Sequence, residues 1–103
     1  MWYTFEGWLG EARIVPAPWI VGETEHAYQV INHEGKKSWR EKRSWHCIFP
    51  SYEATRDRLI AALRYSLVQA TSDPEEYPYS ETQLTQMCTR LTELEIEAEQ
   101  AVS

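Results

Sequence analysis

The residues of this sequence that are best suited to bind a ligand lie in one basic stretch. Five of the ten Lys and Arg residues in the chain fall within it: Lys36, Lys37, Arg40, Lys42 and Arg43. Trp39 and Trp45, two of the five tryptophans, lie among them. Basic groups bind phosphate or carboxylate, and the indole ring of tryptophan offers a flat face on which a base can stack. The stretch therefore predicts a site for an anionic ligand, either nucleotide-like or a segment of nucleic acid.

The alternation of residue types around this stretch leaves a second interpretation open. From Lys37 to Phe49 the pattern keeps a period of two, which favours one long strand with a bulge near residues 40–43. A short hairpin at that point is the alternative. In an unbroken strand both tryptophans share a face with Phe49, so they could also point into the core while the charges cover the solvent side.

The charge of the chain is unevenly distributed. It holds 16 acidic and 10 basic residues, a net charge of −6. Residues 73–103 hold eight of the acids and only one arginine. Tyr77 and Tyr79 lie in a polar segment before the helix that we predict over residues 80–102, and tyrosine is enriched at protein interfaces. The acidic half therefore predicts a second kind of surface, one that contacts a partner protein.

No residue pattern indicates catalysis or metal binding. The candidate ligands are scattered: His26, His33, His46, Cys47 and Cys88. Only His46 and Cys47 are adjacent, and neighbours on a strand point to opposite faces. The short paired spacings of zinc sites, a glycine-rich phosphate loop, and the HExxH and GxSxG motifs are all missing from the sequence. We expect no catalytic residue, no metal and no cofactor, and we predict that the protein is not an enzyme.

The first half of the chain reads as strands that would carry the basic stretch. Residues 1–50 are rich in aromatic and β-branched residues and predict an antiparallel sheet of about four strands. One of these covers residues 12–21, where Pro16 and Pro18 imply an edge position or a bulge. Residues 25–32 alternate clearly, and Gly35 can take the positive φ that a hairpin turn after them needs.

The second half reads as two helices. Ser51 is a good N-cap for a helix over residues 51–70, and residues 71–79 form a polar linker. Ser80 and Gln83 make a capping box for a helix over residues 80–102. Its apolar residues are spaced 3, 4, 3, 4, 3 along one seam: Leu84, Met87, Leu91, Leu94, Ala98 and Ala101. The seam packs on the first helix, or it also meets a second copy of the chain.

Strands followed by helices predict one α+β domain over residues 1–103. We expect a homodimer, with Leu84, Met87, Leu91, Leu94, Tyr77 and Tyr79 as interface residues. The N-terminal residues lack a basic leader, and the apolar run over residues 15–21 is broken by proline. We therefore expect a soluble, cytoplasmic protein with no membrane contact.

A tryptophan-rich sheet that ends in "FPSYEATRDRLIAAL" (residues 49–63) and leads into a polar helical tail resembles small accessory proteins of phages and prophages. The resemblance covers residues 36–100 and implies a compact, non-catalytic protein that binds and blocks, as counter-defence proteins do. The sequence thus predicts a small binding or inhibitory protein that sequesters an anionic ligand at the basic strand. The alternative is a protein–protein inhibitor or adaptor that acts on a host protein through the acidic helix and the tyrosine-containing linker.

Overall fold

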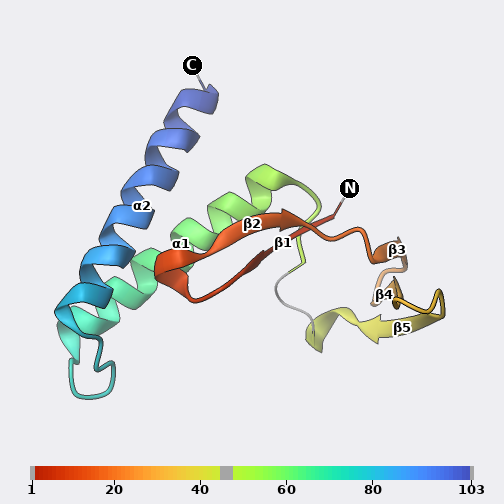
Figure 1. Cartoon of the computed structure of the whole chain (residues 1–103), viewed down its shortest axis with the longest axis horizontal. Coiled ribbons are helices and arrows are strands. Elements are labelled where there is room, and N and C mark those ends of the chain that lie inside the picture. The colour runs from red at the N-terminus through yellow and green to blue at the C-terminus, as the bar shows by residue number, and fades with distance from the viewer. Residues whose placement is uncertain (1, 45–47, 103) are drawn as a thin grey trace.

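A computed structural model describes residues 2–44 and 48–102 of the chain, and it confirms the α+β class (Figure 1). Five strands precede two helices in the described part. The strands are β1 (Tyr3–Glu6), β2 (Arg13–Pro16), β3 (Ile20–Glu23), β4 (Ala27–Ile31) and β5 (Lys37–Glu41). The helices are α1 (Tyr52–Ser72) and α2 (Glu81–Val102), and short 3-10 turns lie at Leu9–Glu11 (η1) and Lys42–Ser44 (η2).

The strands form two antiparallel sheets rather than the single sheet expected. β1 pairs with β2, and β3, β4 and β5 form a second sheet in that order. The predicted strand over residues 12–21 is two strands, because the chain leaves β2 at Pro16 and turns at Pro18 before β3 begins. Proline cannot donate a ladder hydrogen bond, so this segment is a natural place for the chain to pass from one sheet to the other.

The hairpin between β4 and β5 forms where the sequence predicts it. Gly35 has a φ of +84°, in the left-handed region that favours glycine. The Asn32 side chain holds the loop, because its Oδ1 accepts hydrogen bonds from the backbone N–H groups of Glu34 and Lys36 at 2.9 and 3.0 Å. The chain therefore enters β5 in a fixed register, with Lys37 opposite Ile31 and Trp39 opposite Gln29.

The strand predicted over residues 37–49 is shorter than expected. β5 ends at Glu41, and the Lys42 N–H donates to the His26 carbonyl at 2.9 Å just before β4 begins. Because β4 begins at Ala27, the partner of Glu41, β5 has no further residue to pair with and the chain turns into η2. Phe49 pairs instead with Tyr3 of β1. Neither the long strand nor the alternative hairpin at residues 40–43 is present in the described residues.

The two helices begin at the predicted caps. The Ser51 hydroxyl accepts a hydrogen bond from the Ala54 N–H at 3.1 Å. At α2 the capping box is complete, since Gln83 N–H donates to the Ser80 hydroxyl at 3.1 Å and Ser80 N–H donates to the Gln83 Oε1 at 2.8 Å. The observed helices cover 52–72 and 81–102 against predicted ranges of 51–70 and 80–102.

The main core lies between the helical hairpin and the β1–β2 sheet. Its fully buried side chains come from both helices: Leu59, Leu63, Met87 and Leu94. Side chains from the first sheet and η1, such as Phe5, Leu9 and Ile14, pack on them. The seam of α2 therefore packs against α1 within one chain, which was the first of the two interpretations of its heptad spacing.

A second, smaller core covers one face of the three-stranded sheet. Ala17, Ile20, Tyr28 and Val30 are buried there. Trp2, from the start of the chain, lies edge-on against Tyr28 with ring centroids 5.1 Å apart, and Ile48 packs beside this cluster. Within the described residues only this face of the sheet is covered, because the helices pack on β1, β2 and η1 and lie away from β3, β4 and β5 (Figure 1).

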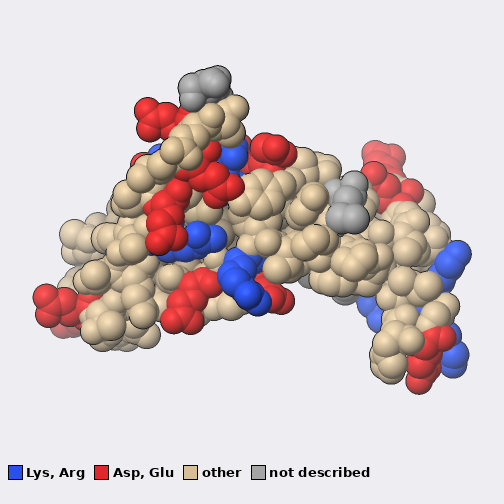
Figure 2. All heavy atoms as spheres, turned by 45° about the horizontal axis from the view of Figure 1, so that its top comes forward, with Lys and Arg blue, Asp and Glu red and all other residues tan. Residues whose placement is uncertain are grey.

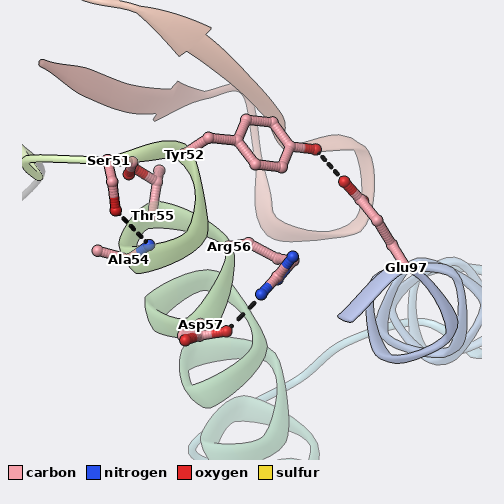
Figure 3. A network of polar contacts seen from close by, with 7 residues as sticks. All are labelled: Ser51, Tyr52, Ala54, Thr55, Arg56, Asp57 and Glu97. Atoms are coloured by element: carbon pink, nitrogen blue, oxygen red, sulfur yellow. Dashed lines mark hydrogen bonds and ion pairs between the residues drawn. The ribbon is translucent and has the colours of Figure 1, made fainter. Parts of the chain in front are cut away.

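A polar network joins the two helices where α1 begins (Figure 3). The Tyr52 hydroxyl donates a hydrogen bond to Glu97 of α2. Arg56, one turn further along α1, is buried and its Nε lies 3.4 Å from Asp57 Oδ1. From α2, Arg90 Nε donates to the Ala12 carbonyl at 2.9 Å and ties the helix to the first sheet. The hydrogen bond to Glu97 raises the pKa of Tyr52 above its usual value of 10.0, and burial adds to the effect.

Among the described residues, neither helix contains a stretch that is long and apolar enough to cross a membrane.

Replacing Tyr52 with Phe should lower the stability of the fold. Because a partly buried hydrogen bond to a carboxylate is lost, we expect the free energy of unfolding to fall by about 1 kcal/mol and the melting temperature by roughly 4–8 °C. Urea denaturation at neutral pH measures the change. Tyr79→Phe is the control, since the Tyr79 hydroxyl forms no hydrogen bond within the described residues. An equal loss in both variants would contradict a role for the Tyr52–Glu97 contact.

The hydrogen bond between Tyr52 and Glu97 also predicts how the stability of the fold changes with pH in alkaline solution. Since the pKa of Tyr52 is raised in the folded state, its contribution is fully present below the usual value of 10.0 and is lost as pH rises through the folded-state pKa. The difference in stability between the wild type and Tyr52→Phe should therefore shrink above about pH 10. A difference that stays constant or grows there would contradict this assignment.

Candidate ligand-binding face

The three-stranded sheet has one face that the described residues of the chain leave open. Tyr28 and Val30 of β4 point into the small core, so Gln29, which lies between them, and Ile31, which follows Val30, point the other way. We call this side the outer face. Register and alternation along β4 and β5 assign six residues to it: Ala27, Gln29, Ile31, Lys37, Trp39 and Glu41.

Trp39 and Lys37 lie together at the centre of the predicted site. They are two residues apart on β5, so their side chains emerge on the same face of the sheet. The Trp39 side chain is 52% exposed, which excludes the interpretation that it points into the core. Lys37 is exposed and forms no ion pair within the described residues. An accessible indole beside an uncommitted ammonium group is the combination that a flat anionic ligand needs.

Trp19 and Val21 also belong to this face, and the sequence did not single them out. The Trp19 carbonyl accepts a hydrogen bond from the Ile31 N–H at 2.9 Å, which continues the pairing of β3 with β4 by one residue. Ile20 is buried, so Trp19 lies on the opposite side, 37% exposed. Val21 lies in a bulge, since both it and Gly22 occupy the space opposite Gln29. The spacing of Trp19 and Val21 was a usable signal, but the break at the prolines concealed it.

The remaining basic residues do not extend this face. Arg40 pairs with Tyr28 in the register, so it points to the side away from Trp39. Lys42 Nζ lies 2.7 Å from Glu23 Oε2 and sits over the Tyr28 ring at 5.0 Å. Arg43 Nε lies 2.8 Å from Glu41 Oε2. Both of these cations already have a carboxylate partner, and this makes them poor contacts for a second anion.

Two predicted site residues occupy the ends of the segment. Lys36 is exposed at the end of the β4–β5 loop, next to Lys37 in sequence. Trp45 lies outside the described residues, so its part in the predicted site stays a prediction. Of the seven predicted ligand-binding residues, the structure therefore brings Lys36, Lys37 and Trp39 to one accessible region.

The predicted interface residues of the helical half are mostly part of the core. Met87 and Leu94 are fully buried, while Leu91 and Tyr79 are half-buried against the same core. Leu84 is half-buried near the start of α2. Tyr77 is also half-buried, and the neighbouring phenol of Tyr65 raises its pKa. A partner could reach Met87 and Leu94 only if α2 left α1.

The charges of the molecule are distributed in two ways (Figure 2). Acidic side chains outnumber the arginines among them over the helical hairpin, and basic and acidic groups also lie side by side around the three-stranded sheet. Four glutamates lie near the basic stretch: Glu23, Glu25, Glu34 and Glu41. The positive potential there is therefore modest. A ligand would be held mainly by stacking, with one or two lysines adding charge.

Two hollows elsewhere are less suited to an anion. One of about 330 Å³ lies at the end of β5 and is lined by Glu25, His26, Glu41, Lys42 and Arg43, whose charges largely cancel. Another of about 430 Å³ lies between η1 and α2, where Arg90 is committed to the Ala12 carbonyl and to Glu93. Within residues 2–44 and 48–102, no three His, Cys, Asp or Glu side chains converge as metal ligands.

Comparison with protein-family models, curated proteins and solved structures finds no match for this chain. The resemblance to phage accessory proteins therefore stays an expectation, and the case for function depends on the geometry of the outer face.

The exposure of Trp39 can be measured directly. Because its indole is open to solvent, Trp39→Phe should remove a large share of the fluorescence that acrylamide quenches. Trp2→Phe should remove little of it, because Trp2 packs on Tyr28. If the two variants lost equal quenchable emission, the outer face would not be open as described.

Proposed function

We propose that this chain is a small non-enzymatic binding protein that holds a nucleotide-like anion on the outer face of its three-stranded sheet. The observation that supports this proposal is that Trp39 and Lys37 lie next to each other on the exposed face. The base of such a ligand stacks on the exposed indole, and its phosphate lies at the lysine ammonium. Lys36 adds charge at the margin of the same region.

The physical balance of the site favours stacking over bulk charge. Stacking of a base on an aromatic side chain contributes about 1–3 kcal/mol and does not depend on net charge. An exposed ion pair contributes about 1 kcal/mol or less. A protein with a net charge of −6 can therefore bind an anion here, provided that the anion carries a flat aromatic group.

The biological role that fits this chemistry is sequestration. Such a protein removes a nucleotide signal from solution without altering it, which is the kind of role that the resemblance to counter-defence proteins of phages implies. A site on an open sheet face, with no enclosing cavity, suits binding and blocking better than turnover.

A panel of nucleotides tests the proposal by thermal shift. A nucleotide at 100 times its Kd should stabilise the protein by about 2.7 kcal/mol. Trp39→Ala should weaken binding by about 10-fold to 100-fold through the loss of stacking. The double charge reversal Lys36→Glu and Lys37→Glu should weaken binding by roughly 10-fold, because two exposed contacts of about 1 kcal/mol or less each are lost.

Arg43→Glu is the matched control, because Arg43 is on the same segment but is paired with Glu41. It should keep the affinity of the wild type. An unchanged melting temperature with every nucleotide would refute the proposal. Equal losses in the control and in the Lys36/Lys37 variant would mean that charge alone, rather than this face, drives binding.

A second candidate function is a protein–protein inhibitor or adaptor, and one observation favours it. On the outward side of α1, Tyr65 and Val68 are 61% and 60% exposed, and Tyr77 of the linker lies beside Tyr65. This patch includes a residue of the tyrosine-containing linker, through which this hypothesis expects a partner to be reached. A second copy of the chain is the simplest partner and would give the expected homodimer.

Sedimentation velocity over a range of protein concentrations tests this candidate. If copies associate through the patch, the wild type should dimerise and Val68→Glu should remain monomeric, because the substitution places a charge in an apolar contact. Val21→Glu, at an exposed valine of the other surface, is the control and should still dimerise. A wild type that is monomeric at every concentration would contradict association through the patch.

A further inference from the structure

The outer face carries a second exposed indole, and its position relative to the first restricts the ligand. Trp19 lies opposite Ile31, and Ile31 lies opposite Lys37, so these three residues form one row across the sheet. Trp39 lies in the next row along β5, opposite Gln29. Lys37 is therefore in the row of one indole and is the same-face neighbour of the other.

The spacing of these rows sets the distance between the two indoles. Adjacent strands lie about 4.8 Å apart and same-face neighbours on a strand about 6.7 Å apart. Trp19 and Trp39 are two strands and one such step apart, which places their backbones roughly 12 Å from each other. One base cannot stack on both rings across that distance, whereas two bases of one strand can.

We propose that the ligand of the outer face is a single-stranded segment of nucleic acid that stacks one base on Trp19 and another on Trp39. This inference rests on the proposed function and deepens it. Lys37, near both indoles, contacts a phosphate of the backbone between the two bases. The floor between the indoles consists of Ile31 and Val21, which offer an apolar surface to the sugars and bases.

Gln29 adds a polar group within this floor. Its side chain lies on the outer face next to Trp39, and its amide has no hydrogen-bond partner within the described residues. A carboxamide can donate to and accept from the edge of an unpaired base. Gln29 is therefore placed to contact a base that stacks on Trp39.

A duplex would not fit this arrangement. Its bases are stacked on one another, so their flat faces are not free to meet the indoles. Duplex binding also depends on many phosphate contacts, and the uncommitted cations of this face are few. The acidic side chains over the helical hairpin would repel a long duplex that extended toward them (Figure 2). A short single strand that stays on the sheet avoids most of this repulsion, since charges are screened beyond about 8 Å at physiological salt.

Fluorescence anisotropy with labelled ligands tests the inference in the full-length chain. The series is a mononucleotide, a dinucleotide, oligothymidylates of increasing length and a duplex of the same sequence. Affinity should rise by at least about 10-fold between the mononucleotide and the shortest oligonucleotide that reaches both indoles, because a second stacked base is gained. It should change little with further length, and the duplex should bind more weakly.

The variants separate the two indoles. Trp19→Ala should reduce the affinity for the oligonucleotide to that for the mononucleotide and leave the latter unchanged, while Trp39→Ala should weaken both. Trp19→Phe keeps a stacking ring and should retain most of the gain, which guards against a loss caused by misfolding. Because few phosphates are contacted, the salt dependence should be shallow, with a slope of about −0.7 in log K against log[salt] for each phosphate.

Three outcomes decide between the inference and the proposal beneath it. If nucleotides bind through Trp39 but neither length nor Trp19→Ala matters, the two-base inference fails and the proposed function stands. If neither mononucleotide nor oligonucleotide binds, both fail. If the duplex binds as tightly as the single strand, or more tightly, stacking on the indoles is not the mode of binding and the inference is overturned.

Discussion

Within the described residues, the three-stranded sheet is covered on one face because Trp2 and Ile48 pack there, while the helices pack on the other sheet. Both of these side chains, which come from outside the sheet, lie on the side of Tyr28 and Val30. The backbone makes the same connection, since the Ala17 N–H donates to the Trp2 carbonyl at 2.7 Å and Tyr3 pairs with Phe49. The helices supply most of the buried residues of the main core and lie against the other sheet. This attachment of one face to the start of the chain leaves the indoles of the other face exposed.

The helical hairpin supplies the stability that the three-stranded sheet lacks. Four side chains are completely buried: Leu59, Leu63, Met87 and Leu94. The burial of each contributes roughly 1.5–3 kcal/mol to the stability of the fold. The smaller core has only four buried residues. Three strands with one apolar face are close to the lower limit of independent stability. A sheet of this kind remains ordered because β1 and Phe49 link it to the helices, and its outer face is then free to carry residues that do not stabilise the fold.

Much of the fold could be predicted from local patterns, and the errors have a common physical cause. Helix caps at Ser51 and Ser80, the alternation before Asn32 and the left-handed glycine at position 35 all depend on neighbours in sequence, and the structure confirms them. The prediction of one strand over residues 37–49 was wrong because alternation does not reveal where the partner strand stops. β4 begins at Ala27, so pairing ends near Glu41 whatever the pattern beyond it. The α2 seam was recognised, but spacing alone could not decide whether it met α1 or another chain.

The candidate site shows the same division between local and long-range information. Composition drew attention to the basic stretch, yet pairing across the sheet decides which of its charges remain available. Glu23 is 19 residues from Lys42 in sequence and nonetheless lies 2.7 Å from its ammonium group. Trp19 is far from the basic stretch in sequence, yet it lies on the same outer face of the sheet as Lys37 and Trp39. The count of basic residues thus overstates the charge of the site, while the count of tryptophans within the stretch understates its aromatic surface. Since stacking tolerates a negative net charge better than ion pairing does, the geometry makes recognition of an unpaired base by this acidic protein physically reasonable.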